Sequence, residues 1–162
     1  MQREESPEQL IALLVHHPDE LADQVRGLDA IAWRTRPLEG EWSVTEILCH
    51  LRDVEREVNI PRLHRLVEEV FPFLAPADTD VLVQTRHYQD QDGPAALTTF
   101  TTARRELCRY LTNLPADAWQ RQARHALFGL TTLRELVSLV VDHDQAHLKQ
   151  LTETVRSVMR NT

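Results

Sequence analysis

The segment that follows Thr132 constrains the fold most, because it predicts a single long helix. Thr132 and Glu135 have the spacing of a capping box, in which each side chain accepts a hydrogen bond from the other's backbone N–H. The sequence that follows, LRELVSLVVDHDQAHLKQL, repeats its apolar residues every three or four positions. A helix of about 25 residues is roughly 40 Å long. An apolar stripe of that length has to be buried against other helices.

Three other segments have helical patterns. The first begins after Ser6, an N-cap residue followed by proline, and Gly27 can end it. The second begins after Ser43, which has capping-box spacing with Glu46. The third covers PAALTTFTTARRELCRYLTNL and stops before Pro115. Four helices of similar length around one core predict an all-α four-helix bundle.

The interruptions in these patterns predict how the helices connect. Pro18 should break the first helix, and Pro61 should kink or restart the second, because proline lacks the N–H that a helix interior needs. Residues 71–93 have no clear helical period, and their DVLVQT piece suggests a short strand. Twenty-three residues can run back along a helix, so the second and third helices could lie parallel. We expect one domain over residues 1–162.

Composition and charge exclude several classes of function. The formal net charge is −7 and no stretch is dense in Lys or Arg, which argues against nucleic-acid binding. No apolar run is long enough to cross a bilayer, and the charged first residues argue against a signal peptide. Cys49 and Cys108 are far apart and outside any CxxC spacing, so we expect neither a disulfide framework nor a zinc ribbon. A cytoplasmic protein is the simplest interpretation.

His143 and His147 form the first candidate functional pair. They lie four residues apart, so on a helix their Cβ atoms are about 5–6 Å apart and both rings can reach one metal ion. About 0.4 such pairs per chain are expected by chance at this histidine content, so spacing alone is weak evidence. Both rings, however, continue the apolar stripe of Leu136, Val140 and Leu151, which directs them into the bundle.

His50 gives the same signal on the second helix. It shares a face with Ile47, Val54 and Val58, so a third imidazole is expected to point inward. Three imidazoles from two helices match a catalytic metal site with three protein ligands and an open position. The alternative is three buried histidines that are hydrogen-bonded to backbone or side chains. We favour the metal, because one cation satisfies several neutral rings at once.

The other five histidines are expected to be peripheral. They are His16 and His17, solvated beside Pro18; His64, without a partner; His87, in the long connection; and His125, at the surface or at the mouth of a cavity. Cys49 precedes His50, but successive helical residues point about 100° apart, so Cys49 should be a small core residue.

Asp144 and Asp53 are the candidate catalytic residues. Asp144 completes the sequence HDQAH, which differs from the HExxH of zinc proteases because aspartate is one methylene shorter and no third protease ligand follows. Asp144 could orient an imidazole or hold a metal-bound water, or it could be a surface charge. Asp53 lies one turn after His50 and has the same two interpretations.

Two stretches resemble the signatures of the DinB/YfiT-like superfamily. RPLEGEWSVTEILCHLRDVERE resembles the helix that bears one histidine after a Trp-Ser cap. HALFGLTTLRELVSLVVDHDQAHLKQL resembles the last helix of that family, with its Thr-Leu cap and HxxxH. The resemblance covers most of residues 19–155.

The resemblance implies a four-helix bundle with up-down-down-up order, consistent with the long connection between the second and third helices. It also implies a divalent metal, commonly zinc or nickel, bound by three histidines. Carried onto this sequence, the ligands are His50, His143 and His147. Members of the family include thiol transferases that use bacillithiol or mycothiol, and many others are called metal-dependent hydrolases. Some members are dimers.

The sequence therefore predicts a metal-dependent enzyme that acts on a small molecule. Thiol transfer is preferred to hydrolysis from the resemblance alone, with a low-molecular-weight thiol as its cofactor, and a homodimer is an open expectation. No obvious basic pocket for an acidic thiol is visible, although Arg52, Arg56 and Arg62 lie near the ligand on the second helix. A non-catalytic metal-binding or stress-related module is the alternative.

Overall fold

The computed structural model describes residues 5–160. Residues 1–4, which contribute to the expectation that no signal peptide is present, and residues 161–162 lie outside this range. Among the described residues, no helix combines the length and the apolar character that a membrane span requires. The main helices are α1 (Pro7–Val25), α3 (Val44–Val54), α4 (Ile60–Glu68), α6 (Gly93–Thr112) and α7 (Leu133–Arg160).

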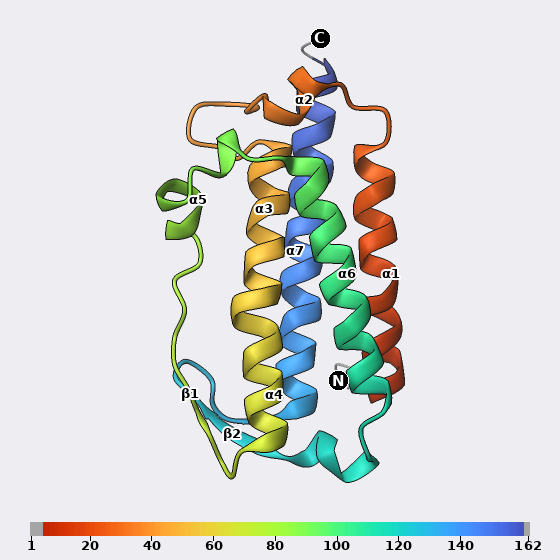
Figure 1. Cartoon of the computed structure of the whole chain (residues 1–162), viewed down its shortest axis with the longest axis vertical. Helices are drawn as coiled ribbons and strands as arrows, with labels where there is room; N and C mark the ends of the chain where they lie inside the picture. The colour runs from red at the N-terminus through yellow and green to blue at the C-terminus, as the bar shows by residue number, and fades with distance from the viewer. Residues whose placement is uncertain (1–4, 161–162) are drawn as a thin grey trace.

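These helices form a four-helix bundle, in which α3 and α4 together make one of the four rods (Figure 1). The rods α1 and α7 run from the end that carries the small sheet towards the end that carries α2 (Ala30–Arg34), and the other two rods run in the opposite direction (Figure 1). The connection between α4 and α6 returns along the outside of α3. It therefore lies beside the second rod over most of its length.

The helices begin where their local capping signals predict. Ser6 and Gln9 form a capping box at α1, with the Ser6 N–H donating to Gln9 Oε1 at 2.8 Å. Ser43 and Glu46 do the same at α3. The backbone N–H of Thr132 donates to Glu135 at 2.7 Å at the start of α7. These start sites follow from side chains three residues apart, so they need no tertiary contact.

The two interior prolines act differently from each other. The predicted break at Pro18 is wrong, because α1 continues through it to Val25. Pro18 is buried on the same face as Leu14 and Leu21, and this packing offsets the missing backbone hydrogen bond. At Pro61 the second rod does change, since a π-helical turn (Glu55–Asn59) separates α3 from α4.

The connections contain secondary structure that the sequence pattern did not predict. DVLVQT is not a strand: Val81–Thr85 form the short helix α5. A three-stranded sheet instead closes one end of the bundle, in the order β1 (Phe73–Leu74), β2 (Gln122–His125), β3 (Gly129–Thr132). The β1–β2 pair is parallel and the β2–β3 pair is an antiparallel hairpin. Strands of two to four residues are too short to show a period in sequence.

The core consists of two apolar clusters with a polar layer between them. One cluster surrounds Leu14, Leu66, Leu107 and Val137 at the sheet end, and the other surrounds residues that include Phe100. Every rod contributes to the intervening layer, which contains His17, His50, Glu55, Arg104, His143, Asp144 and His147. The candidate functional side chains lie in this layer.

Candidate metal centre

Three histidines from two helices meet in the polar layer. His50 comes from α3, and His143 and His147 come from successive turns of α7. Each offers one ring nitrogen, and these nitrogens all lie within 4.8 Å of one another. The ring centroids are 4.4 Å apart for His143 and His147, 4.7 Å for His50 and His147, and 5.6 Å for His50 and His143. We call these residues the three-histidine site.

The environment keeps these imidazoles neutral. Burial lowers the pKa of His50 to about 4, with the His147 ring acting in the same direction and the backbone of Thr79 opposing it. Burial also lowers the pKa of His143 to about 3, reinforced by His147 and His50. The pKa of His147 is lowered by burial as well, against the hydrogen bond that its ring donates to Gln150. A neutral imidazole has a free lone pair, which is the form that binds metal.

The hydrogen bonding of these rings fits a bound cation. Neither ring nitrogen of His50 has a hydrogen bond of ordinary geometry among residues 5–160, and the same holds for Nδ1 of His143. Such unsatisfied buried groups cost free energy unless something else binds them. His147 Nδ1 lies 2.8 Å from Gln150 Oε1, so that nitrogen donates to the amide oxygen and Nε2 remains available for the metal.

The donor set suits a tetrahedral metal such as zinc. Three nitrogens at the usual Zn–N distance of about 2.0–2.1 Å would lie about 3.4 Å apart, so small side-chain rotations would close the site. Imidazoles also suit nickel, copper and iron. Trp42 covers part of the site, because its ring stacks on His147 with centroids 6.1 Å apart and lies 5.0 Å from the His50 ring.

A cavity of about 200 Å³ adjoins the site, and His143 forms part of its wall. Apolar side chains from α7, the second rod and the β2–β3 hairpin make up most of the lining, and the polar residues are Asn59, Arg62, Thr79 and His125. A partly open, mainly apolar cavity beside three side chains that could hold a metal ion is where a substrate would be held.

Asp144 lies next to the site in sequence but points into the bundle. Its carboxylate accepts two hydrogen bonds from Arg104, at 2.6 and 3.2 Å, and Arg104 also donates to Glu55 at 2.6 and 3.0 Å. Burial raises the pKa of Asp144 to about 6, with Arg104 opposing. Asp144 makes no hydrogen bond to the three-histidine site among the described residues. Its role beside a ligand or a water stays a prediction.

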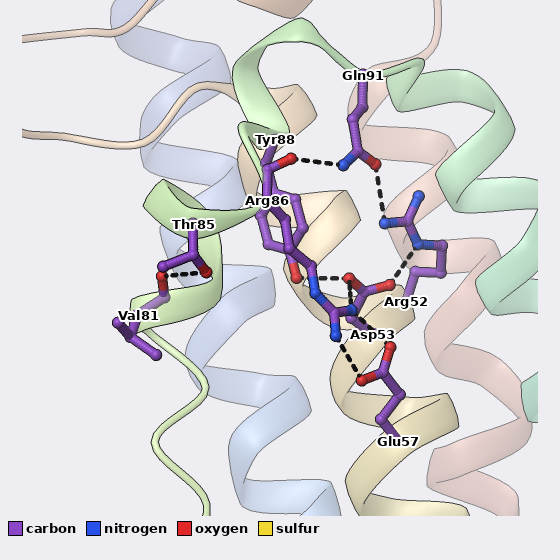
Figure 2. A network of polar contacts seen from close by, with 8 residues as sticks. All are labelled: Arg52, Asp53, Glu57, Val81, Thr85, Arg86, Tyr88 and Gln91. Carbon is purple, nitrogen blue, oxygen red and sulfur yellow. Dashed lines mark hydrogen bonds and ion pairs between the residues drawn. The ribbon is translucent and has the colours of Figure 1, made fainter.

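Asp53 belongs to a separate network of polar contacts, shown in Figure 2. Its carboxylate accepts from Arg52 at 2.6 Å, Arg86 at 2.7 Å and the Tyr88 hydroxyl at 2.6 Å. Arg86 also binds Glu57. Asp53 thereby attaches the connection between α4 and α6 to α3, and its predicted role next to His50 also stays a prediction.

Two expectations for the other histidines are wrong. His17 is 3% exposed and lies in the polar layer, 3.7 Å from Asp144, because α1 continues through Pro18. His64 has a partner, since its Nδ1 lies 3.0 Å from Glu68. For His125, the structure supports the cavity alternative and not the surface one, because this residue is buried and lines the cavity. The remaining two, His16 and His87, are exposed as expected, and Cys49 is a buried core residue.

Several residues of this region were not predicted from the sequence. Gln150 could have been found, because it lies three residues after His147 on the same helix face. Arg104 also left a signal, since it occupies a core position in step with Phe100 and Leu107. Nothing in the sequence indicated the contact between Trp42 and the His147 ring, because that contact depends on how the loop before α3 folds over α7.

Comparison with known proteins places the chain in a family. The sequence matches the model of the DinB superfamily over residues 13–151. The chain belongs to the DinB superfamily. The resemblance seen in the two histidine-bearing stretches is therefore confirmed. No curated protein shows significant similarity to the sequence.

The DinB fold is also supported by a solved structure. It is described as "YfiT from Bacillus subtilis is a probable metal-dependent hydrolase with an unusual four-helix bundle topology". The match has a TM-score of 0.83 and 22% sequence identity, and it covers 96% of this chain and 91% of that one. At this identity the likeness establishes the four-helix bundle, and the chemistry has to be argued from the site.

Proposed function

We propose that this DinB-superfamily chain is a divalent-metal-dependent enzyme in which His50, His143 and His147 hold the ion. The convergence of three neutral imidazoles within 4.8 Å, on two helices, carries the proposal. It is supported by the unsatisfied ring nitrogens of His50 and His143. Three protein ligands would leave a coordination position for water or substrate, as in catalytic zinc sites.

The chain's own groups would prepare the site for that ion. Burial keeps the rings unprotonated, and Gln150 fixes the tautomer and direction of His147. The apolar wall of the cavity next to His143 would exclude water from a bound substrate. A divalent ion would supply Lewis-acid chemistry, lowering the pKa of a coordinated water or thiol towards neutrality.

Between the two reactions, we propose thiol transfer first and hydrolysis second. Thiol transfer follows from the resemblance to bacillithiol- and mycothiol-dependent members, and hydrolysis is supported by the description of the YfiT structure as a probable metal-dependent hydrolase. The substrate would be a small molecule. A low-molecular-weight thiol cofactor, a cytoplasmic location and a homodimer are part of the same proposal.

Metal analysis of protein purified without a histidine tag tests the site. Wild-type protein is expected to bind about one equivalent of zinc or nickel, measured by elemental analysis after dialysis. His50→Ala and His143→Ala should each lose most of it. His16→Ala is the matched control, because His16 is exposed on α1 and should leave the metal content unchanged. Unchanged metal content in the two site variants would show that the assignment is wrong.

Turnover assays then separate the reactions. Metal-loaded and metal-free protein are incubated with candidate thiols and an electrophilic acceptor, and separately with activated esters. Metal-dependent thioether formation supports the transferase, and metal-dependent ester cleavage supports the hydrolase. A protein that binds metal but turns over neither class would favour the non-catalytic binding module.

A further inference from the structure

Among residues 5–160, the lining of the cavity beside the three-histidine site includes one arginine and no carboxylate. Its lining is mainly apolar, with side chains such as Val58, Phe128, Leu136 and Leu139. Of the described residues that line it, Arg62 on α4 supplies the only formal charge, apart from any proton on the histidines. Its side chain is half-buried. A guanidinium in an apolar wall is costly unless a counter-charge binds it.

No acid of the described chain supplies that counter-charge. Arg62 donates a hydrogen bond to the backbone carbonyl of Ala75, and it forms no ion pair within residues 5–160. Burial lowers the pKa of Arg62, and no carboxylate acts against it. Acids are not scarce, because the chain has 25 of them against 18 Lys and Arg. On the same helix, Arg65 is paired with Glu69.

A second donor belongs to the same cavity. His125 Nδ1 accepts from the backbone N–H groups of Leu127 at 3.1 Å and Phe128 at 3.4 Å, so the neutral ring carries its proton on Nε2. Nε2 has no hydrogen-bond partner among the described residues. Burial and the nearby Arg62 both lower the pKa of His125, which favours the neutral ring. The cavity therefore offers one positive charge and a neutral donor.

We propose that the cavity binds a compact molecule with an apolar body and one carboxylate, and that Arg62 binds this carboxylate. One guanidinium matches one negative charge, and its planar pair of N–H groups matches the two oxygens of a carboxylate. The size fits an aryl group, since a cavity of about 150 Å³ holds benzene and this one is about 200 Å³. The body would lie against the apolar wall, with the molecule's other end towards His143. That last point rests on the proposed metal-dependent function, whereas the binding of the carboxylate by Arg62 does not.

Binding of matched probes tests the proposal without requiring turnover. The probes are 3-phenylpropionate and its neutral analogue 3-phenylpropanol, titrated by calorimetry into wild-type protein in metal-loaded and metal-free form. The carboxylate should bind about tenfold or more tightly than the alcohol in both forms, because a hydrogen-bonded charge pair contributes that much. Arg62→Gln should remove the preference and leave the affinity for the alcohol unchanged. Arg62→Lys should restore part of it.

Arg56→Gln is the matched control, since it removes the same charge from an exposed position on the same rod. It should keep the full preference. Equal carboxylate affinity in Arg62→Gln and wild type would overturn the proposal. So would a preference that disappears on metal removal yet survives Arg62→Gln, because the carboxylate would then bind the ion. A wild-type protein that binds neither probe at millimolar concentration also overturns it.

The failure of either proposal can be recognised separately. If His50→Ala keeps its metal, the metal-site assignment fails, but the preference for carboxylate in metal-free protein still reports on Arg62. If the preference is absent while the metal analysis behaves as expected, only the inference about Arg62 fails. Circular dichroism of the Arg62 variants shows whether loss of the bond to Ala75 changes the fold.

Discussion

Replacing Arg104 with methionine should destabilise the fold more than any exposed charge change. Arg104 is fully buried between Glu55 and Asp144, and it makes four hydrogen bonds to their carboxylates at 2.6–3.2 Å. Methionine has no charge and is shorter than arginine, but it can fill the space of the aliphatic part of the arginine side chain. The two carboxylates would then remain in the polar layer without their cation, and this is the main cost of the substitution.

The magnitude follows from that arrangement. Removing one partner of a buried ion pair costs about 3–5 kcal/mol, because the other charge stays buried without compensation. Glu55 and Asp144 are both almost fully buried, so the upper half of this range is expected. For a chain of this size about 1 kcal/mol lowers Tm by roughly 2–4 °C, which predicts a decrease of roughly 8–20 °C.

Urea unfolding and thermal denaturation, followed by circular dichroism, measure this loss. Arg26→Met is the control, because Arg26 is 79% exposed and paired with Asp23 at the surface. It should change the free energy of unfolding by less than about 0.5 kcal/mol. A loss below about 1 kcal/mol in Arg104→Met would refute the conclusion that this arginine neutralises the polar layer.

The pH dependence gives the prediction a second, independent test. Without Arg104, which opposes the effect of burial, the folded-state pKa of Asp144 rises further above its unfolded-state value. The unfolded chain then loses this proton at a lower pH than the folded chain does. The free energy of unfolding of the variant therefore falls as the pH rises from about 4 towards 7. The difference in the free energy of unfolding between variant and wild type should therefore be smaller at pH 5 than at pH 7. A larger difference at pH 5 would contradict the assignment.

Three further predictions concern the metal site and the packing around α6. Burial lowers the pKa of His50 to about 4 and that of His143 to about 3, so bound metal should be retained below the ordinary histidine pKa of 6.5 and released as the pH approaches 4. A release midpoint above 6.5 would contradict this. Gln150→Leu should weaken the affinity for metal about 10–100-fold in a chelator competition assay, because His147 loses the group that orients it. An unchanged affinity would show that the contact is dispensable. Gly93→Ala should lower the free energy of unfolding in urea by about 1–3 kcal/mol, because the new Cβ would lie 2.6 Å from Cε3 of Trp33. An unchanged free energy of unfolding would mean that the Trp33 ring moves easily.

Much of the fold and the three histidines of the proposed metal site could be predicted from neighbouring residues in the sequence. The capping box at Ser43 determines where α3 starts, and once the helix starts there its period directs His50 inward. The same holds for His143 and His147 after the cap at Thr132. Each of these relationships spans three or four positions, so the helix geometry itself enforces it.

The errors arose where packing overrides a local rule. Pro18 remains inside α1 because its buried neighbours stabilise that helix face, and His17 consequently turns into the core. DVLVQT adopts a helical turn, because Arg86 at its end binds Asp53 and Glu57 on the neighbouring rod. Isolated five-residue helices have little stability of their own, so no local pattern could have revealed this one.

By itself, the sequence determined the four amphipathic rods and the inward direction of the three-histidine site, because these depend on interactions within one helical turn. Only the tertiary structure decided which polar groups meet in the layer between the two apolar clusters. Arg104 pairs with Glu55 and Asp144, which lie 49 and 40 residues away in the chain. Such pairs form only after the rods pack, since burial then makes each unpaired charge costly and each correct partner stabilising.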